Sequence, residues 1–174
     1  MLTTFAIVML IAAACIAGMF LLSFTSSSPV DLGVRDGRLA KCSESPNCVS
    51  TQAEDHDHWI APLTIQKNSE NVIDVLEGIV LRLPRVLIIE KSSTYLRVEF
   101  RSAFFRFVDD VEFYAEPESG RVHFRSASRV GRSDLGVNRA RMETIRSLFQ
   151  ATQPALTTSP VSPANAGAPL PVRQ

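Results

Sequence analysis

The sequence lacks an excess of charge of either sign, because 18 basic residues balance 18 acidic residues along 174 positions. A nucleic-acid-binding protein would carry a net basic domain, so we expect no nucleic-acid partner. Repeats of solenoid length are also missing, and we expect no cofactor. At this length a single globular domain with a real core is the default.

Cysteine is scarce, with three residues, and no recognisable base accompanies them in a pattern typical of a cysteine nucleophile. Cys42 and Cys48 bracket the turn-forming insert Ser-Glu-Ser-Pro-Asn. This spacing favours a disulfide that staples a segment without a core of its own, and therefore an oxidising compartment. The alternative is a pair of reduced thiols in a cytosolic loop.

A metal site is a weaker interpretation of the same segment. Zinc would need two more ligands, for which Asp55, His56, Asp57 and His58 are the candidates. Zinc-binding cysteines are more often about two to four residues apart, and a His-x-His in a charged loop is usually exposed. We therefore predict no metal site.

Basic residues are absent before and within the run from Phe5 to Phe24, which is twenty residues long and carries no charge. This length suits a helix that crosses the hydrocarbon layer. A cleaved signal peptide usually has a basic start and a shorter apolar stretch, so we expect an uncleaved anchor that tethers the protein to the membrane. Lipidation at Cys15, which follows three alanines, is a further alternative.

Two features of the sequence disagree about the side of the membrane on which the domain lies. Arg35, Arg38 and Lys41 follow the apolar run, and the positive-inside tendency alone would leave the domain in the cytoplasm. The paired cysteines instead favour an oxidising side. We expect a single-pass protein whose domain is periplasmic or otherwise extracytoplasmic.

Composition divides the chain into four parts. Residues 1–24 form the N-terminal anchor or signal segment, and residues 25–54 form a linker and a Cys-containing loop, without strand or helix. Residues 55–150 form an α+β domain. Residues 151–174 contain few large apolar residues and are repeatedly interrupted by Pro, so we expect a disordered tail.

Two alternating segments flank the turn at residues 117–120, which has Pro first and Gly last. Pairing outward from this turn matches Glu116 with Arg121 and Glu112 with Arg125. Because side chains alternate along a strand, one face of this hairpin is apolar and the other is polar. The apolar face holds Val111, Phe113, Ala115, Val122 and Phe124. The polar face holds Asp110, Glu112, Tyr114, His123, Arg125 and Arg129.

The remaining segments complete an α+β domain in the order β-α-β-β-β-β-α. A helix capped by Asn68 or Ser69 ends before Pro84, and a second helix begins at Asn138 or Ser133. We predict an antiparallel sheet of about five strands with both helices on its apolar face, preceded by one transmembrane helix.

One connection between strands fits this scheme poorly. Residues 102–106 must join two strands, yet Ala103-Phe104-Phe105 is a poor turn sequence. Two phenylalanines buried at a bend is the preferred interpretation. Contact of exposed aromatic side chains with a membrane surface or a partner is the alternative.

Three motifs, taken in order, resemble the DUF1499 family of bacteria and plant plastids. They are LGVRDGRLAKCSESPNCVS, FRSAFFRFVDDVEF and RSASRVGRSDLGVNRARMETIR, within about residues 32–150. The blocks of the family pattern fall here on residues 45–48, 101–102, 107–110 and 125–129, and on Asp134, Gly136, Asn138 and Arg141. The resemblance implies no established activity. It agrees with an anchored or exported protein, because similar members often begin with an apolar segment.

Four arginines near the start of the last helix are the candidate ligand site. They are Arg125, Arg129, Arg132 and Arg139. Guanidinium groups and the free N–H groups of a helix N-terminus both suit phosphate or carboxylate, so we predict an anion site here. The simpler interpretation is a solvated face held by cross-strand ion pairs. An acid–base or metal pair of Asp109 and Asp110 is disfavoured, because adjacent strand residues point to opposite faces.

These features favour a membrane-tethered, non-enzymatic domain that binds an anionic small molecule or a lipid headgroup. One alternative is a hydrolase that uses Asp109 or Asp110 with His123. The predicted register places His123 two pairs away from Asp110, beyond hydrogen-bond reach, which disfavours it. Another alternative is a scaffold for a larger envelope complex.

Overall fold

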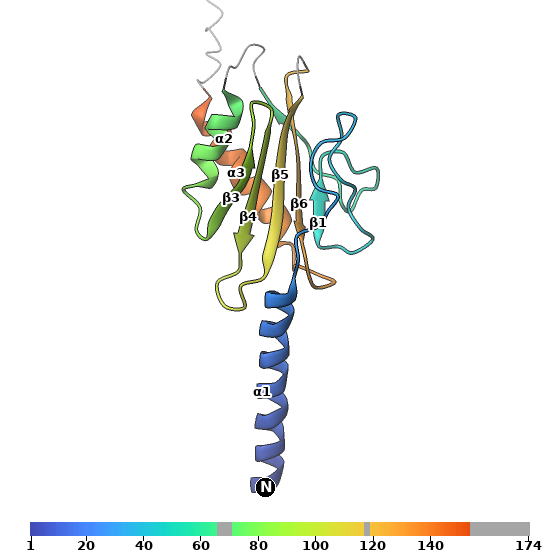
Figure 1. The fold of residues 1–174 in the computed structure, drawn as a ribbon, viewed down its shortest axis with the longest axis vertical. Coiled ribbons are helices and arrows are strands. Elements are labelled where there is room, and N and C mark those ends of the chain that lie inside the picture. The colour runs from blue at the N-terminus through green and yellow to red at the C-terminus, as the bar shows by residue number, and fades with distance from the viewer. Residues whose placement is uncertain (66–70, 117–118, 154–174) are drawn as a thin grey trace, which may run out of the picture.

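The computed structural model describes residues 1–65, 71–116 and 119–153. A single helix, α1 (Leu2–Thr25), projects from one end of an α+β domain (Figure 1). We call this end of the domain the α1 end and the opposite end the distal end.

Helix α1 is long and apolar enough to cross a membrane. Its uncharged span Thr3–Thr25 has 23 residues, and the most apolar window within it has a mean hydropathy of 2.8 and is not buried inside the protein. The run that the sequence predicted to cross a membrane is therefore one continuous helix of suitable length. Such a helix near the N-terminus fits an anchor or a signal segment.

The domain is an antiparallel sheet with two helices on one face, as predicted. The strands are β1 (Cys48–Ser50), β2 (Leu63–Thr64), β3 (Val86–Lys91), β4 (Tyr95–Arg101), β5 (Val108–Glu116) and β6 (Arg121–Ser128). Their order is β1-β6-β5-β4-β3, and the short β2 also pairs with β6. The helices are α2 (Val72–Val80) and α3 (Val137–Thr152).

Strand β1 corrects the prediction that residues 25–54 form only a linker and loop. Cys48 pairs with Ala127 and Ser50 with Arg125, so this segment forms an edge of the sheet. Three residues are too few to show a period of two, which explains why the sequence did not reveal the strand. The Sγ atoms of Cys42 and Cys48 lie 2.02 Å apart, the distance of the predicted disulfide.

The predicted register of the β5–β6 hairpin is confirmed. Glu116 pairs with Arg121, and Glu112 pairs with Arg125, as counted outward from the turn. Residues 117 and 118 of that turn lie outside the described residues. The alternation of side chains then fixes which residues face the helices.

The inner face of the sheet forms the core. Its fully buried side chains include Val98, Phe113 and Phe124, which pack in one cluster with Met142 and Ile145 of α3. Helix α2 adds Val72, Ile73, Leu76, Ile79 and Val80 to the same cluster. The prediction that both helices cover the apolar face is confirmed.

The helix ends differ in detail from the prediction. Helix α3 starts after Gly136, which adopts φ +81, while Asn138, the predicted cap, is completely buried. Asp134 instead accepts the backbone N–H of Asn138 at 2.7 Å. For α2, the predicted caps at positions 68 and 69 lie outside the described residues. Most of the predicted tail, residues 151–174, also lies outside the described residues. Helix α3 continues into its first residues and ends at Thr152.

The outer face of the sheet is not solvated, and the prediction of an exposed charged face is wrong. The side chain of Glu112 is fully buried, and Asp110 is 1% exposed. The linker covers this face: the backbone N–H of Gly33 donates to Glu112 Oε1 at 2.7 Å, and Arg97 donates to Ser28 Oγ. In Figure 1 the linker leaves α1 and rises beside β6. The linker has no hydrophobic period, so the sequence did not indicate that it packs on the sheet.

The loop between β4 and β5 corrects a second prediction. Phe104 is 70% exposed rather than buried at a bend. Its ring and that of Phe105 lie against Phe20 of α1, with centroids 6.2 Å and 5.5 Å apart. This loop therefore lies at the α1 end, and its aromatic side chains contact α1.

Candidate functional site at the α1 end

The four predicted site arginines do not form one site. Arg125 and Arg129 lie on the outer face of the sheet, whereas Arg139 belongs to α3, which covers the inner face. Arg139 donates to the carbonyl oxygens of Asp57 at 2.8 Å and Trp59 at 3.0 Å. Arg132 is exposed in the loop between β6 and α3. The sheet thus separates Arg125 and Arg129 from Arg139.

The outer-face arginines are held by carboxylates. Arg129 Nε donates to Asp110 Oδ2 at 2.7 Å, and the same guanidinium also binds Glu99. Arg97 donates to Asp110 Oδ1 at 3.0 Å. Burial raises the pKa of Asp110, but Arg129 and Arg97 more than offset this and hold that pKa below its usual value. This carboxylate is therefore ionised and fully occupied by protein partners.

Glu112 is the second acid of this face, and Arg125 Nη1 lies 3.6 Å from its Oε2. Burial raises the pKa of Glu112 against the opposing effects of the Gly33 N–H and the Tyr95 hydroxyl, which donates at 2.8 Å. Three arginines and three acids share the face: Arg97, Arg125, Arg129, Glu99, Asp110 and Glu112. The charges balance, so this face is mainly a structural network that binds the linker.

The residues of the alternative hydrolase are also separated. Asp109 and Asp110 point to opposite faces, with Asp109 held by Arg141 of α3 at 2.5 Å. His123 lies by Thr51 Oγ1 at 3.0 Å and Glu116 Oε2 at 3.4 Å. The structure does not bring His123 together with either aspartate.

The metal candidates in the loop at residues 55–58 do not converge on one site. His58 contacts Asp55 Oδ1 at 2.7 Å and the carbonyl oxygen of Ser45 at 3.1 Å, while His56 is fully exposed. Within residues 1–65, 71–116 and 119–153, no group of three or more His, Cys, Asp or Glu side chains could hold a metal ion.

Three segments that carry the family resemblance meet at the α1 end. Arg141 binds Asp109 and also donates to Asn138 Oδ1 at 2.7 Å. Asn138 accepts from the Ser126 hydroxyl at 2.5 Å and donates to the carbonyl oxygen of Asn47 at 2.9 Å. Buried polar groups of this kind need partners, and here each segment supplies them for the others. The network fixes the start of α3 and the loop before it.

Asp109 of this network, together with Ser128, which accepts from the Asn138 amide, lines a cleft of about 440 Å³. The volume lies within the range of about 300–1,000 Å³ that is usual for ligand sites. Loops and α1 build the cleft together. Its lining residues are Met19, Leu22, Ser102, Phe107, Asp109, Ser128, Val130, Gly131, Ser133, Asp134, Leu135 and Val137.

Three serine hydroxyls of the cleft have unused donor capacity. Ser102 Oγ accepts from the Phe107 N–H at 2.9 Å, Ser128 Oγ from the Asn138 amide at 3.0 Å, and Ser133 Oγ from the Leu135 N–H at 3.2 Å. In the described part of the chain none of these hydroxyls donates to a protein acceptor. A hydroxyl both accepts and donates, so each can offer its hydrogen to an oxygen atom of a ligand.

Charge and apolar surface meet at the same cleft. Met19 and Leu22 of α1 and Leu135 and Val137 of the domain form apolar walls. Arg132 lies between two lining residues, is exposed, and forms no ion pair with any residue that the structure describes. Acyl chains suit such walls, and anionic or ester oxygens suit the hydroxyls and the guanidinium.

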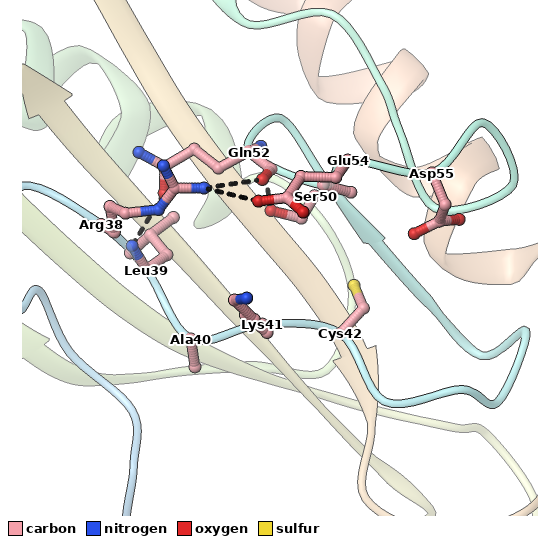
Figure 2. Close-up of a pocket in the computed structure, with 10 residues that line it drawn as sticks. Arg38, Leu39, Ala40, Lys41, Cys42, Ser50, Gln52, Glu54 and Asp55 are labelled. Carbon is pink, nitrogen blue, oxygen red and sulfur yellow. Dashed lines mark hydrogen bonds and ion pairs between the residues drawn. The ribbon is translucent and has the colours of Figure 1, made fainter.

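Two other hollows are less suited to a ligand. The one beside the disulfide measures about 120 Å³, and Figure 2 shows Arg38 pointing across it toward Gln52 and Glu54. Arg38 donates to the Gln52 carbonyl at 3.3 Å, so its charge already has protein partners. The hollow of about 580 Å³ around Trp59 includes Arg139, which also has protein acceptors. The cleft at the α1 end is therefore the candidate functional site.

Sequence reasoning missed the walls of this cleft. Leu135 and Val137 lie in a short, mostly polar loop and helix start, and only contact with α1 groups them with Met19 and Leu22. The polar side could have been found, because Asn47, Asp109, Asn138 and Arg141 all fall within or beside the blocks of the family pattern.

Comparison with known proteins gives a family. No curated protein and no solved structure matches this chain. The family model described as "Protein of unknown function (DUF1499)" matches residues 38–149, which include both the disulfide and the polar network of the cleft. Since this match covers well over half of the 174 residues, the chain belongs to the DUF1499 family.

Proposed function

We propose that the protein is a membrane-tethered, non-enzymatic domain that binds an anionic lipid in the cleft at the α1 end. The observation that carries this proposal is the composition of the cleft. Its apolar walls come partly from α1, while three serine hydroxyls and Arg132 lie beside them. One molecule with an acyl chain and an anionic headgroup would match both parts.

The acyl chain would lie against Met19, Leu22, Leu135 and Val137. Removing such surface from water stabilises a complex by about 25 cal/mol per Å². The headgroup oxygens would accept from the serine hydroxyls, and Arg132 would balance the charge. Asp109 does not oppose an anion strongly, because Arg141 neutralises it at 2.5 Å.

The proposal also includes the membrane anchor, α1, and the compartment that the domain faces. Helix α1 anchors the domain to a membrane, and the Cys42–Cys48 pair favours an oxidising compartment, periplasmic or otherwise extracytoplasmic. A lipid from the outer leaflet of that membrane could then enter the cleft without crossing water, since α1 itself forms one wall.

Thermal unfolding of the full chain in uncharged detergent tests the binding. A ligand that binds only the folded state raises the melting temperature by mass action. We expect a rise with phosphatidylglycerol, a smaller one with phosphatidylcholine, and none with free glycerol phosphate, which lacks the acyl chain. A rise with glycerol phosphate alone would instead indicate a site for a soluble anion. No rise with any of the three would contradict the proposal.

A pair of matched variants locates the binding. Val137 is the first residue of α3, where the helix dipole tolerates an acid, so Val137→Glu should fold but repel an anionic lipid. Val75→Glu places the same change on an exposed valine in the first turn of α2. The melting shift with phosphatidylglycerol should fall by at least half in the first variant and stay unchanged in the second. Equal responses would place the lipid elsewhere.

A further inference from the structure

Two loops at the α1 end carry large apolar side chains that the protein leaves uncovered. Leu135, in the loop between β6 and α3, is 94% exposed, and Phe104, in the loop between β4 and β5, is 70% exposed. Both loops lie beside the end of α1 from which the linker leaves (Figure 1). In the described part of the domain, these two side chains are more exposed than the other large apolar ones, and both lie at this end, where they would suit an interaction surface.

Contacts with α1 show at which position along the helix axis these loops lie. The rings of Phe104 and Phe105 lie against Phe20, which is five residues before the last residue of α1. Leu135 shares the cleft with Met19 and Leu22. The loops therefore contact α1 one to two turns below its end rather than standing above it.

The position of Phe20 along the axis of α1 can be compared with the thickness of a bilayer. At about 1.5 Å per residue, the 24 residues of α1 extend about 36 Å, and Phe20 lies about 10 Å from the midpoint of the helix. The hydrocarbon layer extends about 15 Å from its own midplane. If the two midpoints coincide, Phe20 lies about 5 Å inside the hydrocarbon edge. Side chains that touch Phe20 must then reach the boundary between hydrocarbon and headgroups.

The charges beside these loops fit that boundary. Arg106 and Arg132 are both exposed, and neither forms an ion pair within the described ranges. A basic side chain near an anionic leaflet contributes about 1 kcal/mol, and a long one can extend from the apolar boundary to the phosphates. Apolar tips flanked by arginine are typical of interfacial membrane binding.

We infer that the loops at residues 102–107 and 129–136 form a second membrane contact, in which Phe104 and Leu135 enter the hydrocarbon boundary and Arg106 and Arg132 bind lipid phosphates. The domain is then held against the bilayer instead of swinging on its linker. This inference rests on the membrane anchoring of the proposed function, but it does not require that a lipid occupies the cleft.

Spin labels on the full chain in lipid nanodiscs test the depth of both loops. Cys15, the free cysteine on α1, is labelled in the natural sequence and serves as the reference for the hydrocarbon layer. In the Cys15→Ser background, Phe104→Cys and Leu135→Cys report the loops, and Val75→Cys on α2 reports the distal part of the domain. Labels are attached in detergent before reconstitution, and circular dichroism confirms folding.

Oxygen and a water-soluble nickel complex then measure membrane depth, because oxygen concentrates in hydrocarbon and the complex in water. We expect labels at positions 104 and 135 to collide more often with oxygen than with the nickel complex, as at position 15, and the label at position 75 to show the reverse. Water-like values at 104 and 135, with a hydrocarbon value at 15, would overturn the inference while leaving the anchor intact. A water-like value at 15 would overturn both the anchor and this inference.

Discussion

The outer face of the sheet and the cleft at the α1 end both contain charged and polar side chains, but their partners differ. On the outer face, Asp110 and Arg129 bind each other, and the linker binds the neighbouring Glu112 through the Gly33 N–H. In the cleft, three serine hydroxyls retain donors that the described protein does not use, and the exposed Arg132 lies next to the lining residues Gly131 and Ser133 in the chain. A dense cluster of charge is thus mainly structural here. The cleft is the better candidate for binding, because its free hydroxyls are next to exposed apolar walls, whereas the unpaired nitrogens of Arg97 and Arg125 on the outer face are buried.

The largest expected effect comes from breaking the outer-face network. Asp110→Asn leaves Arg129 and Arg97 without their buried carboxylate, and breaking a buried ion pair lowers stability by about 3–5 kcal/mol. Urea unfolding at neutral pH, followed by the fluorescence of Trp59, measures this loss. Glu143→Gln, which removes an exposed pair with Arg146, is the control and should change stability by less than about 1 kcal/mol.

The difference in unfolding free energy between the natural protein and Asp110→Asn should also depend on pH, which gives a second measurement. Because the pKa of Asp110 is held below its ordinary value of 3.8, its carboxylate contributes stability above that pH and loses it as the pH falls through the folded-state pKa. The unfolding free energies of the natural protein and of Asp110→Asn should therefore converge in acid below pH 3.8. A constant difference down to the lowest measurable pH would contradict the assigned ion pair.

A smaller loss of stability is expected when the disulfide that closes the loop before β1 is removed. A bridge across about seven residues stabilises by about 2 kcal/mol through the entropy of the unfolded chain. Replacing Cys42 and Cys48 together by Ser should lower the free energy of unfolding by this amount. The melting shift with phosphatidylglycerol should stay the same, because neither residue lines the cleft. A lost lipid response would show that the two regions are coupled.

The smallest effect is expected from Arg132→Gln, which leaves the fold unchanged. One exposed arginine contributes about 1 kcal/mol to binding at an anionic surface, so affinity for phosphatidylglycerol should fall about fivefold. Added salt should narrow the difference. Arg121→Gln, at the start of β6 and the distal end, is the matched control and should have no effect. Equal losses in both variants would indicate a general charge effect rather than a site.

The sequence predicted those parts of the molecule that depend on local periodicity. The turn at residues 117–120 and the alternation around it predicted the pairing of Glu112 with Arg125 and the apolar face under the helices. Burial of the outer face could not be predicted, because the linker around Gly33 has no period that indicates packing. The cleft could not be predicted either, since Met19 and Leu135 are far apart in the chain and meet only through tertiary contacts.

Photo-crosslinking in native membranes tests most directly whether the cleft holds an anionic lipid. Benzoylphenylalanine replaces Val137 in the cleft, Leu10 on the exposed surface of α1, and Val75 on α2, and mass spectrometry identifies the attached lipids. We expect anionic lipids at position 137 in clear excess over their share at position 10, and no lipid at position 75. Lipids at 137 in the same proportions as at 10, or none at all, would contradict the proposed lipid site.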